Sequence, residues 1–175
     1  MTPVTGLVVG VAEPVHHVPT GALYTVLVVL HVLCAVVGFG AVVLTGVQAS
    51  RVRLGPAAPG ADSVRRYFRP GTNWAGRSIY GVPVFGFASI AASGGAWRAG
   101  DGFVVIGLVL WLVAAISAEL VVWPSERRVQ NMVTSDWGDA RWAGDLEREC
   151  RRVAALSALL GGIFVVAVVV MVARP

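Results

Sequence analysis

Four long stretches of the chain consist almost wholly of apolar residues, and polar segments separate them. They run over about residues 22–47, 78–97, 103–123 and 153–173. A helix needs roughly 20 apolar residues to cross a bilayer, and windows of this length without strict alternation favour helices over strands. The pattern therefore predicts an all-α integral membrane protein, an antiparallel four-helix bundle, with an external N-terminal arm at residues 1–21.

Arginine placement predicts how this bundle is oriented. All fourteen basic residues are arginine, with six in residues 48–77 and six in residues 124–152. Because cytoplasmic loops carry the excess of basic residues, both segments are predicted to be cytoplasmic loops, and both chain termini are predicted to lie outside. The short connection between the second and third windows predicts that these helices pack side by side. Residues 55–71, rich in Pro and Gly, are expected to be irregular, and Asp139 is expected to cap a helix that continues into the fourth window.

Composition narrows the class further. Of the 175 residues, 56% are hydrophobic and 14% are charged, whereas soluble domains carry about 25% charged residues. This excludes a disordered chain and an ordinary soluble enzyme. The net charge of +4 is explained by the arginines of the predicted cytoplasmic loops, so no nucleic-acid partner is expected. The expected partners are the bilayer, its anionic head groups, and a homodimer or larger membrane complex. The absence of Lys and the abundance of Ala, Gly and Val indicate a GC-rich bacterial genome, and hence a bacterial plasma membrane.

One face of the first predicted helix is unlike the others. Small or polar residues recur on it at alternating spacings of three and four: His31, Cys34, Gly38, Ala41, Thr45 and Gln48. Small residues mark helix–helix contacts in membranes, so this face, called the seam below, is predicted to pack against protein. At a similar depth the second window offers Ser89, which is the predicted partner of His31.

His31 is the only histidine inside a predicted span. A polar side chain within the membrane is a candidate functional residue. Imidazole can ligate haem iron or a metal, relay a proton, or simply hydrogen-bond a neighbouring helix, and the sequence leaves these alternatives open. Cys34, one turn further along, is a second candidate metal ligand, although structural zinc takes four ligands. The alternative for Cys34 is a thiol packed at a helix contact.

Glu119 is the only carboxylate inside a predicted span. It lies four residues from the inner end of the third window, at the same end as Arg77 of the second. A pair between Arg77 and Glu119 that joins two helices is the predicted arrangement. The alternative is a carboxylate that relays protons along a transport path.

The segment Leu30–Gly40, with sequence LHVLCAVVGFG, resembles the first-helix pattern LHxxxAxxxxGG of a family of small bacterial integral membrane proteins of unknown function. The Arg-rich cytoplasmic loop and the run Glu119–Gln130, ELVVWPSERRVQ, extend this resemblance. More distantly, the layout is similar to copper-resistance D-type proteins and to small membrane protoporphyrinogen oxidases. That resemblance implies a first-helix histidine associated with haem or copper, a role that His31 would take here.

Three functions follow as hypotheses. The sequence has no nucleophile elbow, CxxC or CxxCH motif, and no residue is assigned as catalytic. The favoured function is a non-catalytic accessory or partner-binding membrane subunit. The alternative is a membrane protein that binds haem b or a metal through His31. A second alternative is a small proton-coupled transporter or channel, acting as an oligomer, with Glu119 on its path.

Overall fold

The computed structural model describes residues 21–135 and 137–173, and every regular element in these ranges is helical. The elements are α1 (Ala22–Val52), α2 (Ala61–Tyr67), α3 (Trp74–Arg77), the 3-10 turn η1 (Ser78–Tyr80), α4 (Gly81–Ala91), α5 (Gly102–Ser117), the π-helical turn η2 (Ala118–Val122), α6 (Trp123–Ser135) and α7 (Ala143–Ala173). The prediction of an all-α chain is confirmed. The predicted arm lies outside the described residues, except for Gly21.

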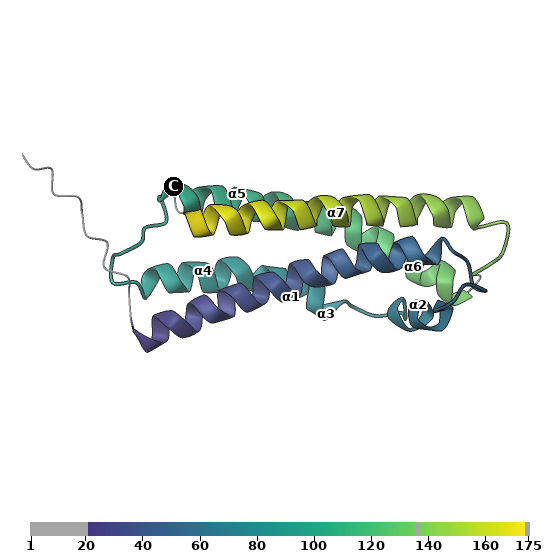
Figure 1. Ribbon diagram of the computed structural model, residues 1–175, viewed down its shortest axis with the longest axis horizontal. Coiled ribbons are helices and arrows are strands. Elements are labelled where there is room, and N and C mark those ends of the chain that lie inside the picture. Colours follow the sequence, from purple (N-terminus) through teal and green to yellow (C-terminus); the bar gives the residue numbers. More distant parts are fainter. Residues whose placement is uncertain (1–20, 136, 174–175) are drawn as a thin grey trace, which may run out of the picture.

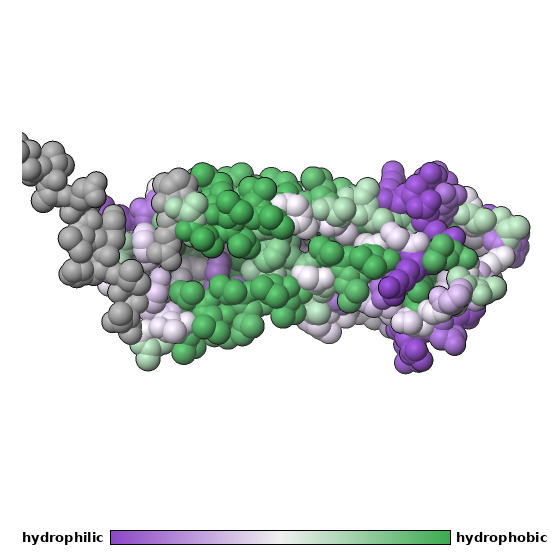
Figure 2. All heavy atoms as spheres, in the orientation of Figure 1, coloured by the Kyte–Doolittle hydropathy of each residue, from purple (hydrophilic) through white to green (hydrophobic). Residues whose placement is uncertain are grey.

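Three helices in the described ranges are long and apolar enough to cross a membrane. They are α1, the continuous run Gly102–Ser135 formed by α5, η2 and α6, and α7. The rest of the protein covers few of their side chains, and large apolar residues on their outer faces are half exposed. Apolar side chains cover most of the length of the molecule, whereas charged side chains gather at the end that carries α2, α6 and the start of α7 (Figure 2). An apolar surface this extensive is typical of contact with lipid rather than water.

The window predicted as one helix over residues 78–97 is broken into shorter pieces. α3, η1 and α4 follow one another without a gap, and regular helix ends at Ala91. Gly94 and Gly95 then take positive φ angles of 64° and 89°, a left-handed conformation that glycine adopts without the steric cost of a side chain. The window is apolar on average although it contains Ser78, Ser89 and Ser93, so its hydropathy did not reveal this early end.

Pro83 removes one backbone hydrogen bond near the start of α4. Proline has no N–H, so it cannot donate to the Ile79 carbonyl four residues earlier. The indole Nε1 of Trp111 on α5 donates to this carbonyl instead, at 2.9 Å. A side chain from a different helix therefore supplies a donor that the proline does not.

Helix α1 lies at the centre of the arrangement. It packs against both α4 and α7, and α5 packs against α7 (Figure 1). The expectation that the second and third windows pack side by side holds only in part. The main neighbour of α5 is α7, and the second window contacts α5 through the hydrogen bond from Trp111 to Ile79 and the ring contact of Trp97 with Phe103. The ten-residue connection 92–101 between α4 and α5 is long enough for the two helices to separate.

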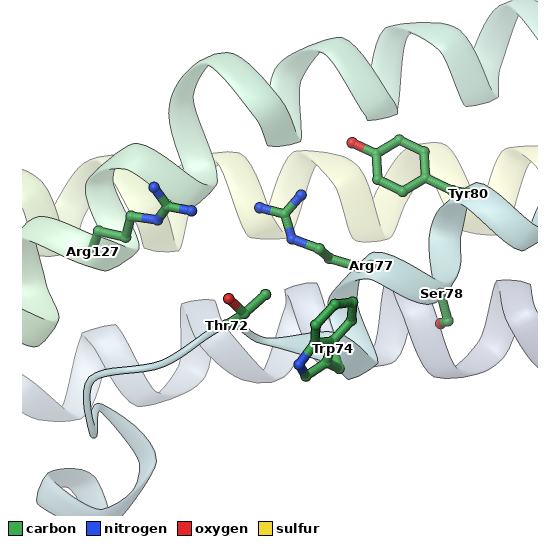
Figure 3. A pocket seen from close by; sticks show the side chains of 6 residues that line it. All are labelled: Thr72, Trp74, Arg77, Ser78, Tyr80 and Arg127. Atoms are coloured by element: carbon green, nitrogen blue, oxygen red, sulfur yellow. The ribbon is translucent and has the colours of Figure 1, made fainter.

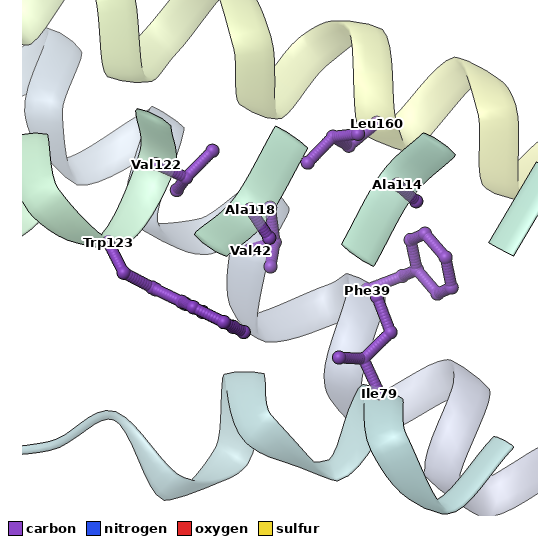
Figure 4. Close-up of a cluster of buried hydrophobic side chains, with 8 residues drawn as sticks. All are labelled: Phe39, Val42, Ile79, Ala114, Ala118, Val122, Trp123 and Leu160. Carbon is purple, nitrogen blue, oxygen red and sulfur yellow. The ribbon is translucent and has the colours of Figure 1, made fainter. Parts of the chain in front are cut away.

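Two clusters of buried apolar residues hold these helices together. The first lies where α1, η1, η2 and α7 converge, and it is drawn in Figure 4: Phe39, Val42, Ile79, Ala114, Ala118, Val122, Trp123 and Leu160. The second lies nearer the charged end and joins α1, α2, α6 and α7. Phe39 also stacks on Phe164 of α7, with ring centroids 4.9 Å apart.

The two predicted loops contain more helix than expected. Helix α2 lies within the stretch 55–71 that was expected to be irregular, and α6 occupies residues at the start of the second loop. Helix α7 does continue through the fourth window, but it begins at Ala143, so Asp139 does not cap it. The Asp139 carboxylate instead binds Arg141 through that residue's backbone N–H and guanidinium, and these bonds hold the pKa of Asp139 below its ordinary value.

Candidate functional site

His31 lies on α1 where that helix meets α4. Its Nδ1 is 2.7 Å from the carbonyl oxygen of Val82. A carbonyl only accepts hydrogen bonds, so Nδ1 carries the proton, and in a neutral ring Nε2 keeps its lone pair. Gly86 lets the ring approach α4, because a Cβ at that position would be 3.1 Å from Nδ1. The predicted partner Ser89 is not the partner found; it donates to the carbonyl of Gly86 at 2.7 Å.

Cys34 lies one turn further along α1, also against α4. A Cβ on Gly81 would be 2.6 Å from its Sγ, so the thiol fills space that only glycine leaves open. Its carbonyl accepts a hydrogen bond from the Ser78 hydroxyl at 3.2 Å. Among the described residues no group of three or more His, Cys, Asp and Glu lies close enough together to hold a metal ion. The contacts of Cys34 are those of a packed thiol.

The remaining seam residues also face protein. Gly38 packs directly on the backbone of η1, where a Cβ would be 2.7 Å from the Ile79 nitrogen. Thr45 and Gln48 are buried, and Ala41 is half-buried. The seam is thus the surface through which α1 contacts η1, α4 and the polar cluster described below.

The structure brings Arg77 and Glu119 together, as the sequence led us to expect. Arg77 Nη1 is 3.5 Å from Glu119 Oε1, and the Tyr80 hydroxyl donates to the same carboxylate oxygen. The guanidinium of Arg77 also lies over the Trp123 ring, 4.2 Å from its centroid, a cation–π arrangement. Glu119 therefore has two partners on the α3–η1 segment, and it joins that segment to η2.

A matched pair of substitutions measures what this contact contributes. We expect Glu119→Gln to lower the free energy of unfolding by about 1 kcal/mol, because polar contacts between membrane helices are worth roughly 0.6–2 kcal/mol. Glu147→Gln removes a partner at the same 3.5 Å distance from Arg53, but at the charged end, where exposed pairs contribute about 0–1 kcal/mol. Thermal unfolding in mild detergent compares the two variants. Equal stability of both would contradict a special role for the Glu119 contact.

Sequence reasoning missed a buried polar cluster at the charged end of the bundle. Thr45 donates to the carbonyl of Ala41 at 3.0 Å, so the Tyr67 hydroxyl 2.7 Å away donates to Thr45 Oγ1. Burial raises the pKa of Tyr67 above its ordinary value. Asn73 Nδ2 also approaches Thr45 Oγ1, at 3.4 Å.

Asn73 joins this cluster to α6. Its Nδ2 lies 3.4 Å from both Thr45 Oγ1 and Glu126 Oε1, and its Oδ1 accepts from the backbone N–H of Gly76 at 3.0 Å. Both amide protons and the amide oxygen are therefore engaged. Glu126 is only 5% exposed. The signal that could have located Glu126 is its place among the apolar residues Val122, Val129 and Val133, which recur at helical spacing.

A second buried carboxylate lies nearby on α7. Glu149 is 8% exposed, and its Oε1 lies 2.9 Å from Arg128 Nη1 and 3.7 Å from Arg152 Nη1. Arg128 belongs to α6, so this contact links the two helices that carry the charged end. Glu126 and Glu149 together place two carboxyl groups inside the arginine-rich part of the protein.

The residues that the sequence places inside predicted spans therefore lie in separate contacts. His31 and Cys34 contact α4, while Glu119 contacts Arg77 and Tyr80 near η2. Comparison of the chain with family models, with curated proteins and with solved structures gives no match.

Proposed function

We propose that this chain is a polytopic protein of a bacterial plasma membrane that acts without catalysis, as an accessory or partner-binding subunit. The observation that carries the proposal is that polar side chains in the apolar part of the bundle, which the long apolar helices form, bind neighbouring helical segments. His31, Trp111 and Glu119 each bind a group on a different helical segment. A side chain that holds two helices together is costly to release for a reaction or a transport step, since its partner would be left unpaired in an apolar medium.

The proposed architecture has four spans with both termini outside. Three of the spans are the long apolar helices, and the fourth is the broken run Trp74–Ala91. At about 1.5 Å per residue this run is roughly 27 Å long, close to the hydrocarbon thickness of about 30 Å. Arginines at the end formed by α2, α6 and the start of α7 support a cytoplasmic placement of that end.

Cysteine labelling tests the orientation. We expect Ala57→Cys to react with a membrane-impermeant maleimide only after cells are opened, and Ala99→Cys to react in intact cells. Both alanines are exposed, so access depends on the side of the membrane. Cys34 and Cys150 are half-buried and buried, respectively, and the parent protein provides the background reading. The reverse labelling pattern would overturn the proposed orientation.

A haem-b or metal protein is the second candidate, and one observation favours it. The Val82 carbonyl fixes the proton of His31 on Nδ1, which is how proteins orient a histidine whose Nε2 ligates a metal. His31 would be the axial ligand, and a second copy of the chain or another subunit would supply any further ligand. For the transporter alternative, the two partners of Glu119 favour a structural contact over a relay.

Two variants of His31 separate the structural role from the ligand role. Under our proposal, the purified protein has no Soret absorption band, and His31→Ala lowers the free energy of unfolding by about 1 kcal/mol through loss of one interhelical hydrogen bond. His31→Gln, whose amide can still donate to Val82, recovers part of that loss. A Soret band in the parent protein that disappears in both variants would establish the haem function instead.

A further inference from the structure

An open groove lies at the charged end of the apolar zone, between α3 and α6. Its volume is about 620 Å³, within the range of about 300–1,000 Å³ for ligand pockets. Six residues line it: Thr72, Trp74, Arg77, Ser78, Tyr80 and Arg127 (Figure 3). The lining therefore combines two cations, the Thr72 hydroxyl and two aromatic rings. The hydroxyl of Tyr80 already donates to Glu119, which also pairs with Arg77, and the hydroxyl of Ser78 donates to backbone carbonyls.

The two cations face each other across the groove. The guanidinium groups of Arg77 and Arg127 point toward one another, and Thr72 lies in the gap beside them (Figure 3). Arg77 is held in this direction by the Trp123 ring beneath it and by Glu119 at its side. Arg127 is exposed on α6. Glu119 pairs with one side of Arg77. An anion between the two guanidinium groups would accept charge-assisted hydrogen bonds from the remaining N–H groups of Arg77 and from Arg127.

Trp74 indicates where the groove lies relative to lipid. The residue is 77% exposed, a costly position for a large aromatic ring in water. Tryptophan and tyrosine are enriched at the boundary between hydrocarbon and water in membrane proteins, and Tyr80 lies on the same groove. The groove thus combines two facing cations with an aromatic edge at the level of lipid head groups.

We propose that this groove binds the phosphate group of an anionic phospholipid. Arg77 and Arg127 hold the phosphate oxygens, the Thr72 hydroxyl donates to one of them, and the Trp74 ring packs on the glycerol and upper acyl portion. The inference rests on the membrane placement proposed above. A lipid suits this site better than a free phosphate ion, because a free ion would leave the aromatic edge without a partner.

Lipid-dependent stabilisation tests the proposal. The full chain is purified in mild detergent and titrated with phosphatidylglycerol, while thermal unfolding is followed. A ligand that binds only the folded state raises the unfolding temperature with its concentration. We expect Arg127→Gln to weaken phosphatidylglycerol binding about tenfold, as the loss of one charge-assisted contact implies. Trp74→Ala is expected to weaken phosphatidylglycerol binding as well. Inorganic phosphate alone should not raise the unfolding temperature of this variant.

The controls distinguish the possible failures. Arg66→Gln removes the same charge from an exposed position outside the groove, and it should bind phosphatidylglycerol like the parent; equal weakening in both variants would show a diffuse electrostatic effect and overturn the site. Phosphatidylcholine, a zwitterionic lipid, should stabilise less. Stabilisation by inorganic phosphate to the same extent would overturn the assignment to lipid. A chain absent from the membrane fraction would refute the proposed placement itself, whereas a membrane-inserted chain without lipid response refutes only this inference.

Discussion

Gly38→Ala is expected to destabilise the protein by about 1–3 kcal/mol, the range for inserting a methyl group into a packed interior. The added Cβ would be 2.7 Å from the Ile79 nitrogen and 3.0 Å from its Cα. Both are backbone atoms of η1, so no side-chain rotation relieves the clash. Either α1 or the α3–η1–α4 run must move, and such a shift would stretch the Ser78–Cys34 hydrogen bond. Gly38→Val should be worse still.

Gly40 provides the matched control on the same helix. Nothing lies within 4 Å of the position where its Cβ would be, so Gly40→Ala adds no clash and should be neutral or slightly stabilising, since alanine favours helix over glycine by up to about 1 kcal/mol. A thiol-reactive dye that labels Cys150 on unfolding reports stability, because Cys150 is buried in the folded protein. Equal unfolding temperatures for the two alanine variants would show that α1 and η1 do not pack as closely as described.

Asn73→Ala is expected to cost about 2–4 kcal/mol, because it removes three engaged groups at once and leaves a buried carboxyl group short of a donor. Glu126 loses its Asn73 contact, and the Gly76 N–H at the start of α3 loses its cap. Asn131 on α6 is exposed, so Asn131→Ala should change stability little. Thermal unfolding in detergent compares the two.

Two further variants separate the two roles of Asn73, which caps the Gly76 N–H through its oxygen and donates to Glu126 through its nitrogen. Asn73→Asp keeps an oxygen for the Gly76 N–H but puts a second carboxyl group next to Glu126, so it should destabilise at least as much as Asn73→Ala. Glu126→Gln in the Asn73→Ala background should restore part of the lost stability, since an unpaired amide costs less to bury than an unpaired carboxylate. If Glu126→Gln gives no recovery, the contact between Asn73 and Glu126 does not carry the effect.

Hydropathy and helical spacing along the chain predicted the long helices and the contact face of α1. Long apolar windows gave α1, α5 and α7, and the spacing of His31, Gly38 and Thr45 gave the face of α1 that contacts protein. The pairing of Arg77 with Glu119 followed from their shared level and opposite charge. Each of these inferences needed only residue type and helical periodicity.

The remaining features depend on contacts between distant segments. No local pattern showed that Trp111 would donate to the Ile79 carbonyl, which Pro83 cannot reach with an N–H, or that His31 would bind Val82 rather than Ser89. The polar cluster around Asn73 was missed because its members come from α1, α2, the α3 cap and α6. In each case, the partner is fixed by how the helices pack, which residue type alone does not encode.

The π-helical turn at Ala118–Val122 determines which way the residues of α6 face around the helix axis. Ala114, Ala118, Val122 and Glu126 are all buried, although each is four residues from the one before. In an uninterrupted α-helix every such step advances about 40° around the axis, so Glu126 would turn well away from the line through Ala114. The wider π turn absorbs part of this drift. The phase of α6 is thereby set separately from that of α5, and the arginine-rich end can keep its own buried face without altering the face that α5 presents to α7.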